Sequence, residues 1–214
     1  MRLLRFLLIV LMIVAGPVLG FAHYLGAFRK ASVERSEFGP ISFIYGTHAG
    51  PLGKLPVSWS SFLEEIESAG IKRCSALAVY LDPPHGGSRG GSQAGAGKRR
   101  VILGCRLGNM DSETRKLAQE AFPSFDLPKL QVLSATFPFK RNFASFFVGP
   151  MKVYPAMTAQ ISENNREHFV SIEIYSLVDA KGVVRANEHT LFAIPVDYPR
   201  DLFTQLDQEF DDKQ

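Results

Sequence analysis

The first thirty residues differ from the rest of the chain in their hydrophobic pattern. Positions 6–28 contain no aspartate, glutamate, lysine or arginine, whereas Arg5 precedes them and Arg29 follows. An apolar helix of about 20 residues crosses a hydrocarbon core of about 30 Å. The pattern therefore predicts an N-terminal transmembrane anchor over 1–30. The alternative is a secretory signal cleaved near 20–22, but the apolar run is longer than the usual h-region of about 7–15 residues.

Beyond this segment, strand-like and helix-like periodicities alternate. Residues 41–48 are rich in β-branched and aromatic side chains, which is typical of a strand. Residues 57–69 place apolar side chains at helical spacing. Residues 75–81 and 100–107 are predicted strands, joined as a hairpin by a glycine-rich loop over 83–97.

The order strand, helix, strand, strand recurs in the second half, about 90 residues later, which indicates an internal duplication. Two such units predict an α+β fold, an antiparallel sheet with helices on one face. A short helix at 111–122, with Asp111 as its cap, connects the copies. The second copy is predicted as strand 130–137, helix 143–161 interrupted at Gly149-Pro150 and Pro155, and strands 168–177 and 188–196 around a turn at 179–182.

Alternation along the strands assigns side chains to two faces of this sheet. Ile172 and Ile174 point to one face, whereas Glu173 and Tyr175 point to the other. In the first copy, Tyr80 faces away from its aliphatic neighbours in the same manner. The aliphatic face suits packing under helices. We therefore expect Tyr80, Glu173 and Tyr175 on an uncovered concave face, which offers a ligand groove.

Composition narrows the possible functions. The chain has 214 residues, 46% of them hydrophobic and 21% charged, as in ordinary globular proteins. The net charge of +3 gives no strong field for nucleic acid, so no direct nucleic-acid partner is expected. Two cysteines, Cys74 and Cys105, fall nearly opposite each other if the hairpin closes near residue 90. They would be thiols in the cytosol and a disulfide in an oxidising lumen.

Several segments together resemble a known family. Residues 45–51 (YGTHAGP), followed by Trp59 and Leu63, resemble the opening of GyrI-like small-molecule-binding domains. The sequence resembles the testis-expressed protein 264 family still more closely. The segments that carry this second likeness are 77–85 (LAVYLDPPH), 132–139 (VLSATFPF), 153–157 (VYPAM) and 173–175 (EIY), in that order, behind an N-terminal anchor.

The resemblance implies a single-pass protein of the endoplasmic reticulum membrane with its domain in the cytosol. It divides the chain into an anchor at 1–30, a GyrI-like domain at 31–196 and a short acidic tail at 197–214. It also implies a non-enzymatic binding or adaptor protein that resembles a receptor for autophagy of that organelle. The family's long disordered tail has no counterpart here. The alternatives are a secreted or lumenal small-molecule-binding protein, or a GyrI-like hydrolase.

Glu173 is the centre of the expected ligand site. A carboxylate among aromatic rings favours a flat, lipophilic cation, because the rings attract the cation and the acid compensates its charge. The resemblance gives the matching glutamate of GyrI-like proteins the same role. A solvated glutamate on an open sheet face is the alternative. The expected ligand-binding residues are Tyr45, Trp59, Tyr80, Glu173 and Tyr175.

Near the C-terminus, Phe203 and Leu206 fit the aromatic-x-x-aliphatic form of autophagy-modifier-binding motifs and have acidic neighbours. Such peptides add a strand to a partner's sheet. The alternative, an amphipathic end of the fold, is favoured because short motifs of this kind arise often by chance.

No catalytic or cofactor motif has the context that it needs. Ser88 lies in a Gly-x-Ser-x-Gly sequence, but in a glycine-rich loop without the strand–turn–helix that activates such a serine. Gly97-Lys98 lacks the following hydroxyl residue of a phosphate loop. The five histidines are scattered, so no metal or other cofactor is expected.

Overall fold

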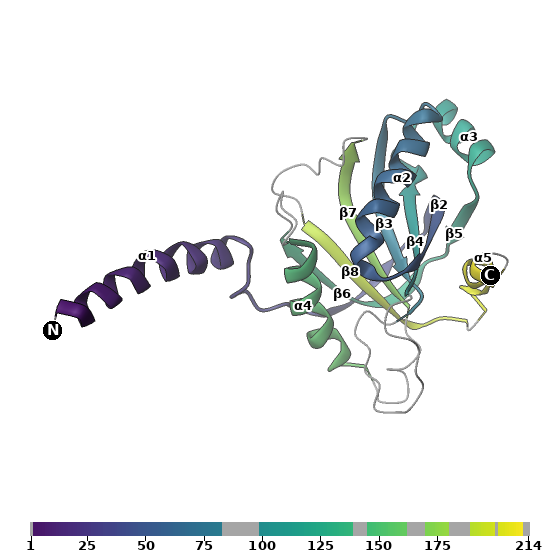
Figure 1. Ribbon diagram of the computed structural model, residues 1–214. Helices are drawn as coiled ribbons and strands as arrows, with labels where there is room; N and C mark the ends of the chain where they lie inside the picture. The colour runs from purple at the N-terminus through teal and green to yellow at the C-terminus, as the bar shows by residue number, and fades with distance from the viewer. Residues whose placement is uncertain are drawn as a thin grey trace.

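Eight antiparallel strands form one sheet in the order β1-β6-β8-β7-β3-β4-β2-β5. The computed structural model describes residues 2–82, 99–138, 145–161, 170–179, 189–199 and 201–211, and Figure 1 shows how their helices and strands are arranged. The strands are β1 (Glu34–Phe38), β2 (Ile41–Gly50), β3 (Arg73–Tyr80), β4 (Arg99–Arg106), β5 (Ser124–Leu127), β6 (Leu130–Pro138), β7 (Ser171–Asp179) and β8 (His189–Asp197).

The predicted duplication is confirmed by the topology. One copy runs β2, α2 (Leu55–Ser68), β3, β4, and the other runs β6, α4 (Ser145–Thr158), β7, β8. In the sheet, β6-β8-β7 mirrors β2-β4-β3, so the two copies meet where β3 pairs with β7. The predicted short helix between them is α3 (Ser112–Ala121), and the Asp111 carboxylate accepts a hydrogen bond from the Thr114 amide at 2.9 Å, as expected of its cap.

Helices α2 and α4 cover the same face of the sheet (Figure 1). Helix α2 packs against β2, and α4 packs against β6 and β8. The space between the two helices therefore lies over the central strands β7 and β3. On α2, Phe62, Leu63 and Ile66 are buried, which is one apolar stripe at helical spacing.

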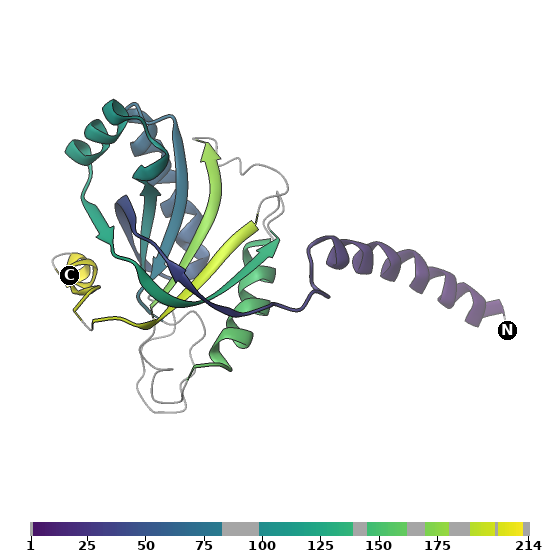
Figure 2. The same cartoon turned by 180° about the vertical axis from the view of Figure 1, so that it is seen from behind.

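The opposite face is filled by large side chains from both halves of the sheet. A single buried cluster contains Phe38 from β1 and Phe125 from β5, the two edge strands, so the sheet curls around it. Helix α5 (Thr204–Asp211) closes this cluster and contacts β2; Figure 2 shows it from behind. Two short 3₁₀ turns, Leu52–Lys54 and Leu107–Asn109, complete the described elements.

Several details differ from the sequence prediction. Helix α4 continues through Pro150 and Pro155, although prolines were expected to interrupt it. Val153, Tyr154 and Met157 are buried on this helix, so its packing on the sheet outweighs the lost backbone hydrogen bonds. Strands β1 and β5 and helix α5 were not predicted. The glycine-rich loop at 83–97 and the turn at 179–182 lie wholly or mostly outside the described residues.

The N-terminal segment forms helix α1 (Arg2–Tyr24). Among the residues that the structure describes, no helix meets the length and apolarity needed to cross a membrane.

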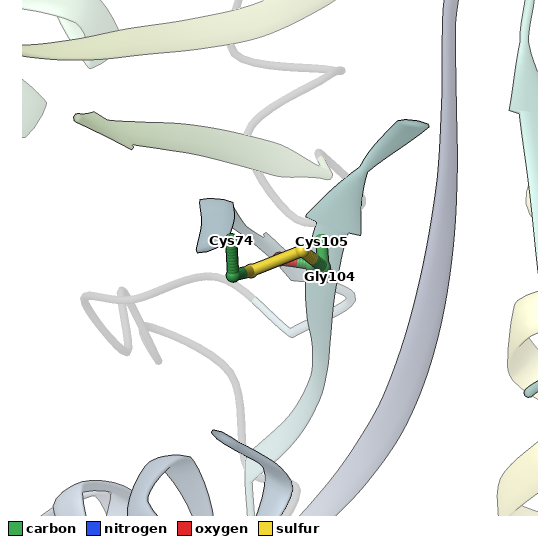
Figure 3. Close-up of a disulfide and its surroundings, with 3 residues drawn as sticks. All are labelled: Cys74, Gly104 and Cys105. Atoms are coloured by element: carbon green, nitrogen blue, oxygen red, sulfur yellow. A yellow bond between two sulfur atoms is a disulfide. The ribbon is translucent and has the colours of Figure 1, made fainter. Parts of the chain in front are cut away.

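Cys74 on β3 and Cys105 on β4 are joined as a disulfide (Figure 3), with their Cα atoms 5.3 Å apart. Ala76 is the direct partner of Cys105, so Cys74 lies two residues along the neighbouring strand. The expectation that the two cysteines are nearly opposite is confirmed.

Close approach of α2 to the sheet depends on a glycine. A Cβ atom added to Gly46 would lie 2.9 Å from Cδ2 of Phe62. We expect Gly46→Ala to lower the free energy of unfolding by about 1–3 kcal/mol, because the helix must shift to relieve this overlap. Gly53→Ala is the control, since nothing lies within 4 Å of its added Cβ, and it should leave stability unchanged or slightly raised. Urea unfolding of both variants is the measurement; equal midpoints would contradict the prediction.

Candidate functional site

Glu173 on β7 is the centre of a buried polar cluster. Glu173 is only 3% exposed. The Tyr154 hydroxyl donates to Oε1 at 2.6 Å, and the Tyr175 hydroxyl donates to Oε2. The Tyr80 hydroxyl lies 3.4 Å from that of Tyr175. Three tyrosines therefore surround one carboxyl group.

The pairing of β3 with β7 brings these side chains together. Ala78 is the partner of Glu173 and Tyr80 is the partner of Ser171. The small side chain of Ala78 leaves room beside the carboxyl group. Tyr154 comes from α4, and Ser171 Oγ lies 3.2 Å from its hydroxyl oxygen. The Tyr154 hydroxyl donates to both Glu173 and Ser171, and the contact with the carboxylate is the shorter of the two.

Helix α2 supplies the aromatic wall of the site. The ring of Trp59 packs edge-on against Tyr175, with centroids 6.3 Å apart, and against Phe62 at 6.1 Å. Phe62 in turn meets Phe122. Trp59 is only partly buried, so it lies at the border between the cluster and solvent. The site thus combines one acid, three phenols and an indole ring.

Burial dominates the electrostatics. Desolvation raises the pKa of Glu173, while the hydrogen bonds from the three tyrosines oppose that rise. Desolvation also raises the pKa values of Tyr80, Tyr154 and Tyr175 well above normal, and the Glu173 charge raises them further. Within the described ranges, no lysine, arginine or histidine forms an ion pair with Glu173. Among the described residues, the carboxyl group therefore has hydrogen-bond donors but no counter-ion.

The structure brings four of the five expected ligand residues together and places the fifth elsewhere. Trp59, Tyr80, Glu173 and Tyr175 form the cluster. Tyr45 points to the other face, where its hydroxyl donates to Glu209 at 2.8 Å and its pKa is raised to about 12, chiefly by burial. The cause is strand alternation, because Ile44 on β2 faces α2 and Tyr45 therefore cannot.

The expectation of an uncovered face was wrong. Tyr80 and Tyr175 share a cluster with Phe62 and Leu63 of α2, so the polar-aromatic face lies under the helices. The aliphatic face, with Leu77 and Val79, fills the inside of the curled sheet. The alternation itself was correct, but the helices cover the face that carries small residues, where their backbones can approach closely.

Two members of the cluster, Tyr154 and Ser171, were not predicted as site residues. Tyr154 was obscured by the helix break expected at Pro155. Val153, Tyr154 and Met157 are all buried in α4, and their spacing of one and three residues is a helical signal that indicates which side of α4 meets the sheet.

Phe203 and Leu206 are core residues of the folded domain. Phe203 is 4% exposed and Leu206 is fully buried, in the same cluster as Phe43 and Tyr45. The ring of Phe203 stacks on Phe125 at 6.3 Å. The segment that was expected as a tail is here an amphipathic end of the fold, and neither side chain can reach a partner's sheet in this state.

Comparisons with known proteins find similarity of shape only. No protein-family model and no curated protein matches the sequence. Among solved structures, SAV2435 bound to tetraphenylphosphonium has a TM-score of 0.49 at 10% identity, covering 78% of this chain and 94% of its own. A putative transcription regulator from Staphylococcus aureus MU50 has a TM-score of 0.47 at 9% identity, covering 78% and 99%.

A conserved protein from Listeria innocua has a TM-score of 0.43 at 10% identity, covering 83% of this chain and 98% of its own. At these levels of similarity, what the three proteins bind says nothing about this chain. The resemblance to the testis-expressed protein 264 family remains a prediction from the sequence.

The raised pKa of Glu173 can be measured. We expect its carboxyl carbon to titrate above the ordinary glutamate value of about 4.3 in a ¹³C NMR experiment. Tyr154→Phe should raise the midpoint further, because the lost hydrogen bond lowers the pKa of Glu173. Tyr198→Phe, on the other face of the sheet, is the control and should leave it unchanged. A midpoint at or below the ordinary value would contradict the assignment.

The raised pKa of Glu173 also makes the free energy of unfolding depend on pH. A folded-state pKa raised above the unfolded value stabilises the native state below about pH 4.3, and this stabilisation is lost as the pH rises through the folded pKa. Glu173→Gln should remove this component of the pH dependence.

Proposed function

We propose that this protein is a binding module for a lipophilic, aromatic cation, which is held over β3 and β7 between helices α2 and α4. The observation that carries the proposal is the buried carboxyl group of Glu173, which has no counter-ion among the described residues and is ringed by aromatic side chains. A bound cation would supply the missing positive charge.

The chemistry of the cluster matches such a ligand. A buried carboxylate is costly unless it is paired, so a cation at this point favours the ionised form of Glu173. The π faces of Trp59 and Tyr175 attract a cation that carries little bound water. The three tyrosine hydroxyls keep the acid in place in either protonation state, because a phenol both donates and accepts hydrogen bonds.

Binding requires the cover of the site to move. Glu173 is 3% exposed, and Tyr154 of α4 and Trp59 of α2 lie against the cluster from its two sides. The two helices belong to different copies of the repeat and pack on different strands, so either can shift without breaking the pairing of β3 with β7. Trp59, which is partly exposed, would be the first ring that a ligand meets.

Binding rather than catalysis is proposed for this cluster. The tyrosine pKa values are raised, so these phenols are poor bases near neutral pH. Apart from these tyrosines, no second acid or base joins Glu173 in the cluster among the residues that the structure describes. A single buried carboxyl group favours charge recognition over hydrolysis.

A place at the endoplasmic reticulum membrane is part of the proposal. The burial of Phe203 and Leu206, however, gives the autophagy-modifier partner no support.

The disulfide bears on which side of the membrane the domain occupies. Disulfides persist in oxidising compartments and are rare in the cytosol. The bonded pair Cys74–Cys105 therefore favours the lumenal or secreted alternative over a cytosolic domain.

The redox state of the two cysteines tests this placement. We expect the denatured protein, isolated from cells with thiols blocked at lysis, to bind maleimide at Cys74 and Cys105 only after reduction. Denaturation is needed because both side chains are buried. Mass spectrometry with and without reductant is the measurement. Two thiols labelled before reduction would place the domain in the cytosol instead.

Ligand binding can be followed by the fluorescence of Trp59, the single tryptophan of the chain. We expect tetraphenylphosphonium to change this fluorescence saturably, and Glu173→Gln to weaken binding at least tenfold, about 1.4 kcal/mol, because the charge partner is lost. Affinity in the unmodified protein should rise with pH through the Glu173 pKa, since only the carboxylate compensates the cation.

Two controls separate charge from hydrophobic contact. Glu120→Gln removes an exposed acid on α3 and should not alter affinity. Triphenylphosphine oxide, which is aromatic but neutral, should bind equally to the unmodified protein and to Glu173→Gln. Equal affinity of both proteins for tetraphenylphosphonium would exclude Glu173 as the recognition group.

A further inference from the structure

A second charged side chain is partly buried on the opposite face of the sheet. Arg100 and Arg106 lie on the same face of β4, because their side chains alternate with the buried residues that meet α2. Arg100 is neutralised, as its guanidinium contacts Asp82 at 2.7 Å and Asp207 at 2.9 Å. These partners raise the pKa of Arg100.

Arg106 is the contrasting case. Its Nε atom is buried and has no hydrogen-bond partner. Nor does any hydrogen bond or ion pair join its side chain to the part of the chain that the structure describes. Burial alone lowers the pKa of Arg106, with no opposing effect of a carboxylate. A half-buried guanidinium without an acceptor is costly, and buried polar groups in native proteins almost always have partners.

A second polar side chain lies beside it. Cys105 pairs with Ala76, so Ser75 is the next residue across from Arg106. Cys74 and Ala76 belong to the cluster under α2, and Ser75 therefore faces the same side as Arg106. Ser75 is 5% exposed, and its hydroxyl is a hydrogen-bond donor close to the Arg106 guanidinium. A hydroxyl and a guanidinium thus lie side by side at the same end of the sheet, and the buried Nε of Arg106 has no acceptor among the described residues.

We infer that Arg106 and Ser75 form a binding site for a small oxyanion, a carboxylate or phosphate group. The guanidinium presents parallel N–H donors that match two oxygens of such a group, and the serine hydroxyl adds a third donor. Phe43, the strand partner of Arg106 on its other side, is 1% exposed and supplies an apolar neighbour. Low local polarity strengthens the charge-assisted bonds.

The site is independent of the cation site. Arg106 is on the face that curls around the aliphatic cluster, whereas Glu173 is under α2 and α4. The two groups cannot share one ligand group, because the sheet separates them. Glu173→Gln should therefore leave oxyanion binding unchanged, which distinguishes failure of this inference from failure of the proposed cation binding.

The test is an NMR titration of the full chain with inorganic phosphate or with acetate, at constant ionic strength set by sodium chloride. The Arg106 Nε–Hε resonance is assigned by its loss in Arg106→Met. We expect this resonance and the Ser75 amide to shift saturably, with a dissociation constant on the order of 1 mM. The anion that saturates at the lower concentration identifies the oxyanion class.

Three variants complete the test. Arg106→Met keeps the apolar stem and should abolish the saturable shift of the Ser75 amide, while Ser75→Ala should weaken binding about threefold to tenfold. Arg35→Met, which removes an exposed arginine from β1, should have no effect. Should Arg106→Met fail to fold, Arg106→Lys is the alternative variant, because it keeps the charge but loses the planar pair of N–H donors. We expect it to bind the anion at least fivefold more weakly.

The inference is overturned by either of two results. One is a chemical-shift change that stays linear in the concentration of either anion up to about 50 mM, which indicates ordinary charge screening rather than binding. The other is a saturable shift that persists in Arg106→Met, or unchanged affinity in Arg106→Lys where the methionine variant does not fold.

Discussion

The pairing of β3 with β7 decides most of this structure. It is the contact that joins the two copies of the repeat into one sheet, and it sets which residues of the two copies face each other. In this register Glu173 is opposite Ala78 and meets Tyr154 from α4. A slip of one residue would turn Glu173 into the aliphatic cluster with Leu77, away from the hydroxyls of Tyr154 and Tyr175. The hydrogen bonds to the acid therefore favour one register.

The same pairing explains why the site lies at the seam between copies. Each helix packs over the outer strands of its own copy, α2 on β2 and α4 on β6 and β8. Side chains from both helices reach over the central strands, among them Trp59 and Phe62 from α2 and Tyr154 from α4. Glu173 on the central strand β7 is thus shielded from water by side chains of both helices. At that position burial raises the pKa of Glu173, and the side chains that cover it come from two separate helices, α2 and α4.

The sequence predicted the repeat, the order of its elements and the two faces of its strands, because these depend on local periodicity. It predicted the wrong face under the helices, since both faces are buried and both are largely apolar. The small residues Gly46, Ala76 and Ala78 were the available signal, because a helix packs closely only where side chains are short. Helix α4 was expected to break at its prolines, because contacts with the sheet are not visible in the local sequence. The short edge strands have too few apolar positions to show a pattern.

Two charged groups of this sheet, Glu173 and Arg106, show how differently a fold can treat a buried charge. Glu173 has several internal donors, so its neutral and ionised forms are both tolerated, and within the described part of the chain it lacks only a counter-charge. Arg106 cannot become neutral near physiological pH, because even a lowered arginine pKa stays far above it. Its unmet hydrogen-bonding capacity must then be satisfied by something outside the described chain, whether water or an anion. An oxyanion meets both needs of Arg106, charge and acceptors, where water meets only the second.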